Sequence, residues 1–451
     1  MTQVAADPTR TAAKLPPGFL IGAATAAYQI EGGWDTDGKG LSIWDVFVRQ
    51  PGTVERGERA DDACRSYERW QDDADLCREL GLDAYRFSIG WSRIQPRGPA
   101  LNSAGLDHYD RFVDALVERG VRPVVTLYHW DLPQWVQDRA GWADRDTAQR
   151  FADYATAVAE RIGDRVHLWC TLNEPWVSTV MGNVFGIHAP GIADGSVAAA
   201  VHHHLLLAHG LGAQAIRAAG ASGGVGIVNA ETLIEPADDS EAAAVAAEAA
   251  RDVWGRGFRL PLWGGGYPER LESVYDGRFP IQAGDMETIA QPLDFIGVNN
   301  YSRELVAPAD GRLGFDRVRG PLPRTEMDWE IAPHALPGVL RVYAAEHPDL
   351  PPIYITENGM ADTAAPVAGA VHDDARVDFL ASYLDALTEA IDDGIDVRGY
   401  FIWTLLDNFE WSFGYRPRFG LVHVDHATGE RTVKDSGRWV AALADELRRR
   451  A

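Results

Sequence analysis

The chain has 451 residues, far more than one small hydrophobic core needs, and 46% of them are hydrophobic, which is typical of a globular protein. It has 66 acidic and 42 basic residues, so its formal charge is −24. A surface so rich in acidic groups argues against binding to nucleic acid or to an anionic membrane. No run of about 18 apolar residues occurs, so the sequence predicts no transmembrane helix.

The N-terminal residues 1–14 are polar and rich in alanine, and we expect them to form a disordered tail before a single domain over residues 15–451. They lack the apolar segment of a signal peptide. The three cysteines, Cys64, Cys77 and Cys170, are too few for a disulfide framework and favour a reducing compartment. Together these features predict a cytoplasmic protein.

Eight short apolar segments rich in β-branched and aromatic residues follow one another along the chain. Near-continuous apolarity is typical of strands that are buried on both faces of a parallel sheet. The predicted strands are 19–29, 84–89, 122–130, 167–174, 225–234, 294–300, 351–358 and 399–407.

Segments with a helical pattern of apolar residues lie between these strands. They are 66–80, 104–119, 147–162, 197–218, 239–253, 377–392 and 434–449, and the pattern is weak in the alanine-rich 239–253. Eight strands that alternate with helices predict an α/β protein of the (β/α)8 or TIM-barrel architecture. A doubly wound sheet is the main alternative, but it rarely needs eight regularly spaced strands.

The chain is longer than a minimal barrel, and most of the additional residues follow the strands. We expect these segments to form long loops over the C-terminal face of the barrel. They are 30–60, 131–145, 175–196, 303–335, 359–375 and 408–432.

Polar residues at the C-terminal ends of barrel strands are candidates for catalysis. Glu174 ends the fourth predicted strand and Glu357 ends the seventh, so both would face one cavity from opposite sides. Two carboxyl groups flanked by aromatic rings form the arrangement that glycoside hydrolysis needs. Other strand ends and the loops beyond them would contribute Gln29, Arg86, His129, Trp130, Asn173, Asn299, Tyr301, Trp403, Glu410 and Trp411.

The segments TLNEP (171–175) and YITENG (354–359) resemble the two catalytic signatures of glycoside hydrolase family 1, the β-glucosidase family. The resemblance covers residues 16–445. Further matching motifs occur in the same order as in the family, and these are FLIGAATAAYQIEGG from residue 19, YRFSIGWSR from 85, YHWDLPQW from 128 and WTLLDNFEWSFGYRPRFGL from 403.

The resemblance implies a retaining β-glucosidase that needs no cofactor and no metal. Glu174 matches the general acid/base and Glu357 the nucleophile, which Arg86 and Tyr301 would keep anionic. Asn173 matches the residue that binds the sugar 2-hydroxyl, and Trp403 matches the floor under the sugar ring. The other implied substrate contacts are Gln29, His129, Glu410 and Trp411 for the 3-, 4- and 6-hydroxyls, Trp329 at the aglycone, and Trp130, Asn299, Tyr301 and Phe419 as further lining.

The expected substrates carry a terminal non-reducing β-D-glucosyl residue, as in cellobiose-like oligosaccharides and aryl β-glucosides. The sequence does not decide whether galactosyl or fucosyl residues are also accepted. It also does not distinguish a monomer from a homo-oligomer. The expected partner is thus a small sugar, with neither nucleic acid nor membrane.

Three alternative functions are less consistent with the sequence. A catalytically silent sugar-binding protein on the same fold typically lacks one glutamate, and this chain has both. A metal-dependent hydrolase needs a ligand cluster at the strand ends, where only His129 is found, and the adjacent His202, His203 and His204 lack the spacing of helical ligands. A 6-phospho-β-glycosidase is disfavoured by Glu410, whose negative charge would repel a phosphate.

Overall fold

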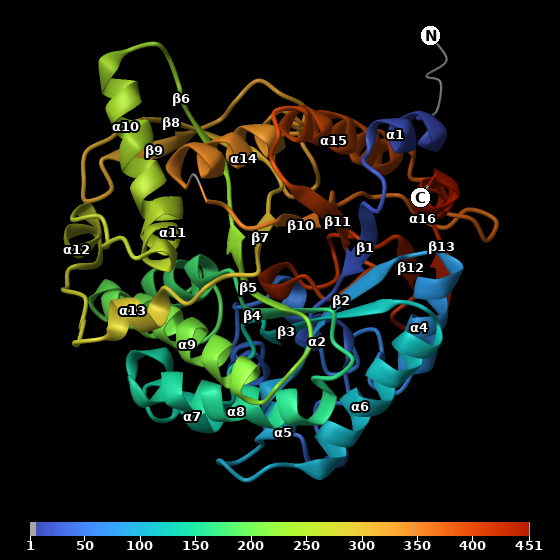
Figure 1. Ribbon diagram of the computed structural model, residues 1–451, viewed down its shortest axis with the longest axis horizontal. Coiled ribbons are helices and arrows are strands. Elements are labelled where there is room, and N and C mark those ends of the chain that lie inside the picture. The colour runs from blue at the N-terminus through green and yellow to red at the C-terminus, as the bar shows by residue number, and fades with distance from the viewer. Residues whose placement is uncertain (1–5, 348, 451) are drawn as a thin grey trace.

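Eight parallel strands close into a barrel in the computed structural model, which describes residues 6–347 and 349–450 (Figure 1). Each strand pairs with the next barrel strand along the chain, and the last pairs with the first. This closed order confirms the (β/α)8 barrel and excludes a doubly wound sheet. The barrel strands are β1 (Leu20–Ala24), β2 (Ala84–Ser88), β3 (Arg122–Tyr128), β4 (Leu168–Asn173), β5 (Gly224–Ala230), β7 (Phe295–Asn299), β10 (Ile353–Asn358) and β11 (Val397–Trp403).

The barrel strands are buried almost throughout, which explains their near-continuous apolarity in the sequence. Their register sets the C-terminal ends at one rim, since Ala24 of β1 lies opposite both Trp403 of β11 and Arg86 of β2. The strands approach closely at Gly22, where an added Cβ would lie 2.6 Å from the ring of Phe401. The side chains at the strand ends therefore meet around a common opening.

Helices surround the barrel, and all seven predicted helical segments are present with ends shifted by a few residues (Figure 1). No pattern in the sequence predicts α14, because Pro337 and Gly338 are typical helix breakers. In the structure Pro337 lies in the first turn, where its missing N–H is tolerated. The long helices are α4 (Trp70–Glu79), α6 (Ser103–Glu118), α8 (Asp146–Ile162), α9 (Ala198–Ala218), α10 (Glu241–Arg251), α14 (Ala335–Glu346), α15 (Asp374–Asp392) and α16 (Asp435–Arg450).

The prediction of a disordered N-terminal tail is wrong for its second half, where Pro8–Lys14 forms helix α1. The Asp7 side chain caps this helix by accepting from Thr9 N at 3.0 Å, and Pro8 occupies the first position, where its fixed φ is favourable. Helix α1 packs against α15 and α16. The folded part of the chain therefore begins before residue 15, while residues 1–5 lie outside the described residues.

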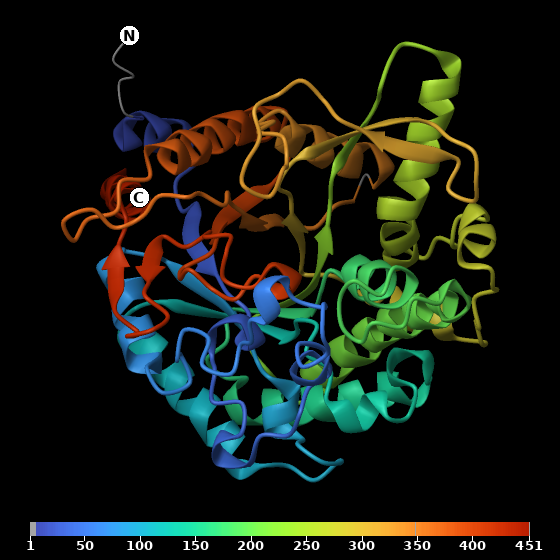
Figure 2. The same ribbon diagram turned by 180° about the vertical axis from the view of Figure 1, so that it is seen from behind.

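The long segments after the strands gather over the C-terminal rim, as expected. Figure 2 shows the blue segment after β1 and the red segment after β11 in front of the barrel strands. Two small sheets are formed there, one by β6 (Leu233–Pro236), β8 (Arg303–Pro308) and β9 (Phe315–Val318), the other by β12 (Val422–Val424) and β13 (Arg431–Val433). The short helices are α2 (Ala27–Ile30), α3 (Ile43–Phe47), α5 (Trp91–Ile94), α7 (Gln134–Gln137), α11 (Gly257–Arg259), α12 (Arg270–Tyr275) and α13 (Asp285–Ile289).

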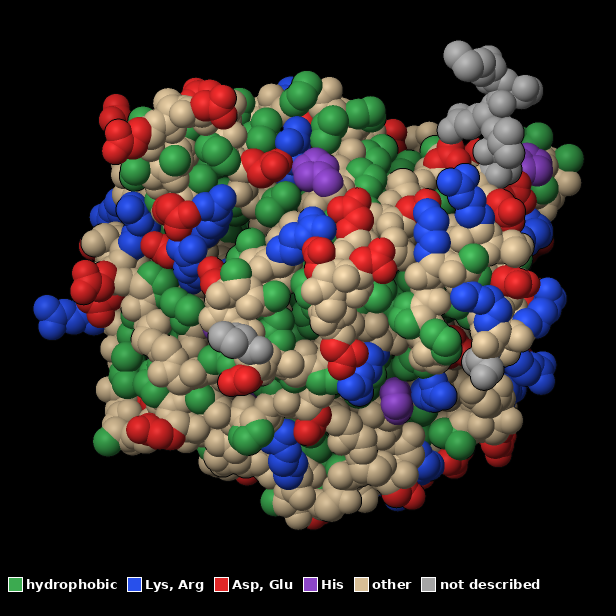
Figure 3. All heavy atoms as spheres, turned by 45° about the horizontal axis from the view of Figure 1, so that its top comes forward, with side chains coloured by type: hydrophobic (Ala, Val, Ile, Leu, Met, Phe, Trp, Pro, Cys, Tyr) green, Lys and Arg blue, Asp and Glu red, His purple; other side chains and the backbone are tan. Residues whose placement is uncertain are grey.

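Acidic and basic side chains are interspersed on the face of the molecule drawn in Figure 3. Many of the surface arginines pair with carboxylates, as Arg165 does with Asp110 and Asp114 between α8 and α6. Within the described residues, no helix is both long enough and apolar enough to cross a membrane.

Candidate active site

A cavity of about 510 Å³ opens at the C-terminal rim of the barrel. Most of the residues predicted for the site line it, and Gln29, Arg86 and Asn173 contact these lining residues from behind. The predicted residues that line the cavity are His129, Trp130, Glu174, Asn299, Tyr301, Trp329, Glu357, Trp403, Glu410, Trp411 and Phe419. The barrel thus brings the whole predicted set together.

The two candidate catalytic glutamates reach the cavity from strands that are not neighbours. Glu357 lies within β10, and Glu174 follows the end of β4, with β7 and β5 between these strands. Both residues are almost completely buried, with 4% and 6% of their surface exposed. Asn299 ends the intervening β7 and contacts Glu174 through its amide group.

Glu357 is surrounded by strong donors. Arg86 Nη1 donates to its Oε1 at 2.6 Å, and the Tyr301 hydroxyl donates to its Oε2 at 2.7 Å. Burial is the largest influence and raises the pKa of Glu357 above its usual value, although the charge of Arg86 and the hydrogen bond from Tyr301 oppose this rise. A charge-assisted hydrogen bond of this kind stabilises the carboxylate form.

Glu174 has a different environment. Its Oε1 accepts from a neutral group, Asn299 Nδ2, at 2.7 Å. Burial, and next the negative charge of Glu357, raise the pKa of Glu174 well above the usual range of a carboxyl group. The pair therefore holds a shared proton preferentially on Glu174, which is the division that an acid and a nucleophile require.

Asn173 joins the two halves of the site. Its Oδ1 accepts from Arg86 Nη2 at 2.7 Å, and its Nδ2 donates to His129 Nε2 at 3.0 Å. Burial and the charge of Arg86 lower the pKa of His129 well below its usual value, so the imidazole is neutral with its proton on Nδ1. Within the described part of the chain, His129 Nδ1 and Gln29 Oε1 are buried atoms without a hydrogen-bond partner. One donor and one acceptor are therefore free for a ligand.

Glu410 lines one wall of the site, and Gln29 contacts it from behind that wall. Gln29 lies in the short helix α2 rather than at the end of the first strand, because β1 ends at Ala24. Its Nε2 donates to Phe409 O at 2.9 Å and to Glu410 Oε2 at 3.4 Å. Burial and the charge of Glu357 raise the pKa of Glu410 to about 8. Burial therefore favours the protonated form of Glu410, which weakens the charge repulsion of a phosphate expected from the sequence.

Aromatic rings line the remaining walls. Trp403 and His129 stack with ring centroids 5.9 Å apart, and Trp130 lies 4.7 Å from Trp411. Toward the opening, Trp329 packs against Tyr301 at 5.1 Å. Such flat apolar faces suit the C–H faces of a sugar ring.

Three residues of the site have a left-handed backbone conformation. Their φ angles are 75° at Trp130, 49° at Glu174 and 50° at Trp411. This region is unfavourable for residues with a Cβ, and each instance costs about 1–3 kcal/mol. The surrounding contacts hold these backbones in place, as the bond from Trp130 Nε1 to Asn173 O does at 2.9 Å.

The sequence did not indicate several lining residues near the opening, among them Met181, Ile187, His188, Met327 and Phe413. They lie on loops and on the π-helical turns 177–184, away from strand ends. Part of this lining could have been predicted, because the segment after TLNEP has more apolar residues than is typical of a loop exposed to solvent.

No metal site is formed among the described residues, where no group of three or more His, Cys, Asp or Glu side chains is arranged to hold an ion. The three adjacent histidines of α9 are buried and have other partners. His203 Nε2 donates to Asp285 at 2.8 Å, and the ring of His204 contacts Trp142 O at 2.9 Å.

A barrel with paired glutamates among aromatic rings is the site of a glycoside hydrolase. The model of glycosyl hydrolase family 1 matches residues 11–448. The chain belongs to this family and is a glycosidase, which confirms the resemblance described above.

Relatives and solved structures agree with this assignment. β-Glucosidase A of Thermotoga maritima is 43% identical over 444 residues, which cover 94% of this chain and 96% of that protein. A bifunctional β-D-glucosidase/β-D-fucosidase of Bifidobacterium breve is 43% identical over 453 residues, with 94% and 96% covered. The β-glucosidase of T. maritima in complex with glucoimidazole has a TM-score of 0.93 at 42% identity, with 96% and 99% of the two chains covered.

Proposed function

We propose that this chain is a retaining β-glucosidase that releases terminal non-reducing β-D-glucosyl residues from cellobiose-like oligosaccharides and aryl β-glucosides. The observation that carries the proposal is the asymmetry of the two glutamates, since Glu357 accepts from a guanidinium and Glu174 from a neutral amide. The names of relatives, β-glucosidases among them, support the same substrate class.

In the first step, the Glu357 carboxylate attacks the anomeric carbon and forms an ester bond to it. The bond from this carbon to the aglycone oxygen breaks, and that oxygen takes the proton of Glu174. The positive charge of Arg86 stabilises the carboxylate of Glu357 before the attack.

In the second step, the Glu174 carboxylate takes a proton from water, whose oxygen attacks the anomeric carbon. The ester bond to Glu357 breaks and glucose leaves with its original anomeric configuration, because the two inversions cancel. Glu174 is protonated again and the enzyme is ready for the next substrate.

The hydroxyls of the transferred sugar would contact the polar wall of the cavity. Asn173 would bind the 2-hydroxyl, and the free atoms His129 Nδ1 and Gln29 Oε1, together with Glu410, would bind the remaining hydroxyls. Trp403 would support the ring, while Trp329 and Tyr301 would face the aglycone. Three buried, unpaired cysteines agree with a cytoplasmic enzyme, which is part of this proposal.

The test replaces Glu357 by Gly and supplies azide to the variant with an aryl β-glucoside. We expect hydrolysis to fall by a factor of about 10⁴ or more, and azide to restore turnover with an α-glucosyl azide as product, since a single inversion then occurs. Wild-type activity in the variant would contradict the assignment.

The matched control is Glu174→Ala with an activated aryl β-glucoside. Here the ester to Glu357 still forms, so azide attacks it in a second inversion and yields the β-glucosyl azide. Opposite anomers from the two variants assign the two roles, and the same anomer from both would refute them. Aryl galactosides, fucosides and cellobiose, measured with the wild type, determine the sugar preference.

A further inference from the structure

The segment after β11, residues 404–424, carries four residues of the cavity wall, Glu410, Trp411, Phe413 and Phe419. It leaves the barrel and returns on itself, since Leu421 N donates to Thr404 O and Val422 N donates to Leu405 O, both at 2.9 Å. We call it the β11 loop. Its two arms meet at a base, and the cavity residues lie beyond that base.

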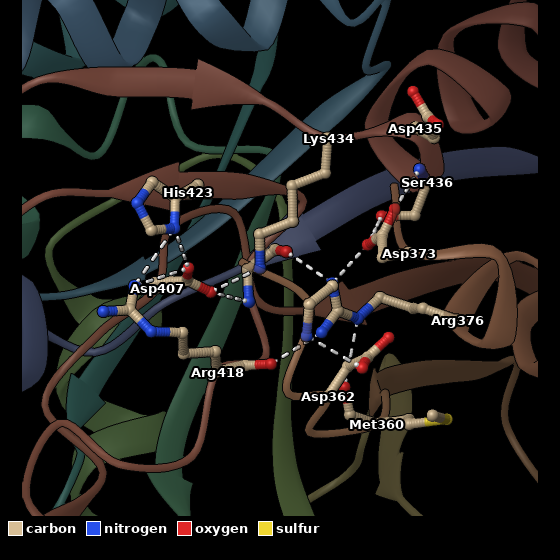
Figure 4. Close-up of polar contacts among 12 residues, drawn as sticks. Met360, Asp362, Asp373, Arg376, Asp407, Arg418, His423, Lys434, Asp435 and Ser436 are labelled. Atoms are coloured by element: carbon tan, nitrogen blue, oxygen red, sulfur yellow. Dashed lines mark hydrogen bonds and ion pairs between the residues drawn. The ribbon is translucent and has the colours of Figure 1, made fainter. Parts of the chain in front are cut away.

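A buried carboxylate fastens the base of the β11 loop. Asp407 is fully buried, and its Oδ1 accepts from Lys434 Nζ at 2.7 Å and from Gly420 N at 2.9 Å. Its Oδ2 accepts from Arg418 Nη1 at 3.1 Å and lies 3.3 Å from the ring of His423 (Figure 4). These bonds join the outgoing arm of the loop, three residues before Glu410, to its returning arm on both sides of Phe419.

A buried guanidinium holds the same arm from the other side. Arg376 of α15 donates to Arg418 O at 2.6 Å, to Gly420 O at 3.0 Å and to Met360 O at 3.1 Å (Figure 4). Met360 is only three residues beyond Glu357 on the chain. The network thus ties the loop that carries Glu410 to the strand that carries the candidate nucleophile.

The network extends to the start of α16. Arg376 is paired with Asp373, whose carboxylate accepts from Ser436 N at 2.8 Å and from Ser436 Oγ at 2.6 Å. Lys434 N also donates to Leu421 O at 2.9 Å. The ionic groups Asp373, Arg376, Asp407 and Lys434 are all withdrawn from water.

Burying so many charges is not an efficient way to stabilise a fold, because the lost hydration offsets most of the attraction between them. Directional hydrogen bonds do, however, select one backbone geometry, and apolar packing selects it less sharply. Beyond the base, Gln29 donates to Phe409 O, Tyr415 N donates to Glu58 Oε2 at 2.7 Å, and Arg416 pairs with Glu55. The ionic base fixes the two arms on which Glu410 and Phe419 lie.

We propose that the buried network of Asp407, Arg376 and Lys434 is a positioning device that sets Glu410 and Phe419 for recognition of the transferred sugar. These residues do not touch the sugar and act through the β11 loop. The inference rests on the proposed function, because it assumes that Glu410 contacts the hydroxyls at the C4–C6 end of glucose.

The test compares kcat/KM for an aryl β-glucoside with that for the aryl β-xyloside, which lacks the C6 hydroxymethyl group. One variant is Asp407→Asn combined with Lys434→Met, which leaves no unpaired buried charge. The other is Arg418→Met, a mild change because the Arg418 side chain is 28% exposed. We expect the glucoside-to-xyloside ratio to fall about tenfold and about threefold respectively, mainly through a higher KM for the glucoside.

The matched control is Asp285→Asn in α13. Asp285 is also a buried carboxylate, and it accepts from Arg145, from His203 and from Gln282 N, far along the chain from the β11 loop. Its loss should lower the melting temperature but change the substrate ratio by less than about twofold, because it does not hold the β11 loop.

An unchanged ratio in either folded variant of the network overturns the proposal, as does an equal change in the control. Arg418→Met keeps the test decisive if the double variant does not fold. A wild-type enzyme that hydrolyses no β-glucoside would instead overturn the proposed function and this inference together. A wild type that hydrolyses glucosides, with no change of ratio in the variants, refutes only the inference.

Discussion

Glu174 and Glu357 are chemically identical side chains, and the donors around them make them different. The guanidinium of Arg86 and the hydroxyl of Tyr301 favour the anion at Glu357, while Asn299 gives Glu174 no positive charge. Because the negative charge of Glu357 raises the pKa of Glu174, the proposed nucleophile helps to keep the proposed acid protonated. This coupling disappears once Glu357 is esterified, and Glu174 then loses its proton more readily, as the second step needs.

The pH dependence of the wild type and a variant tests this coupling. kcat/KM should fall as the pH rises through the raised pKa of Glu174, since deprotonation removes the acid, and it should also fall at low pH as Glu357 is protonated. In Glu357→Gln the repelling charge is lost, so the pKa of Glu174 should be lower, which titration by ¹³C NMR measures directly. An unchanged pKa would show that burial alone raises it.

At the same scale, the sequence predicted the residues at strand ends, because a barrel places all of these at one rim. It located Gln29 on the wrong element, since the apolar segment 19–29 runs past the end of β1 into α2. It gave no indication of His188 or Phe413, because loop conformation over the rim is not encoded by periodicity.

The barrel strands were predictable because strands buried on both faces are apolar along most of their length. Of the described α-helices with seven or more residues, two were not predicted. Helix α14 has Pro337 and Gly338 in its first turn, and α1 buries only the small residues Thr11 and Ala12, so its apolar face is too weak to detect. Such helices form through tertiary contacts rather than through their own pattern.

Helix α1 should contribute to stability without affecting catalysis. Removal of residues 1–14 would break its packing on α15 and α16 and the bond from Trp439 Nε1 to Ala6 O, 2.7 Å long. We expect the melting temperature to fall by about 2–5 °C. Calorimetry measures this change, and kcat/KM for an aryl glucoside is the control. An unchanged melting temperature would show that the helix is not coupled to the barrel.

At the scale of the whole molecule, the net charge of −24 and the side chains that line the cavity both disfavour an anionic substrate. Among the described residues that line the cavity, Arg317 is the one lysine or arginine, and it is paired with Glu304. Arg86, behind the wall, is paired with Glu357. A phosphorylated sugar would therefore lose its hydration without gaining a free cation.

This argument predicts strong discrimination against a 6-phosphoglucoside. We expect its kcat/KM to lie about 100-fold or more below that of the unphosphorylated aryl glucoside, measured on the wild type at pH 7. We expect desolvation of the phosphate to contribute most, because the raised pKa of Glu410 weakens the repulsion by its carboxylate. Comparable rates for the two substrates would mean that a cation reaches the phosphate after all.

The left-handed backbones at Trp130, Glu174 and Trp411 have a consequence for how such an enzyme can evolve. Glycine would adopt the left-handed conformation at each of these positions with less steric strain. At position 174, a side chain that cannot ionise would also cost less free energy to bury than a glutamate. Selection for thermal stability alone would therefore replace these residues first, since their backbone conformations lower the stability of the fold. At these positions the protein exchanges some thermal stability for catalytic activity. Directed evolution for heat resistance should therefore leave the three residues unchanged.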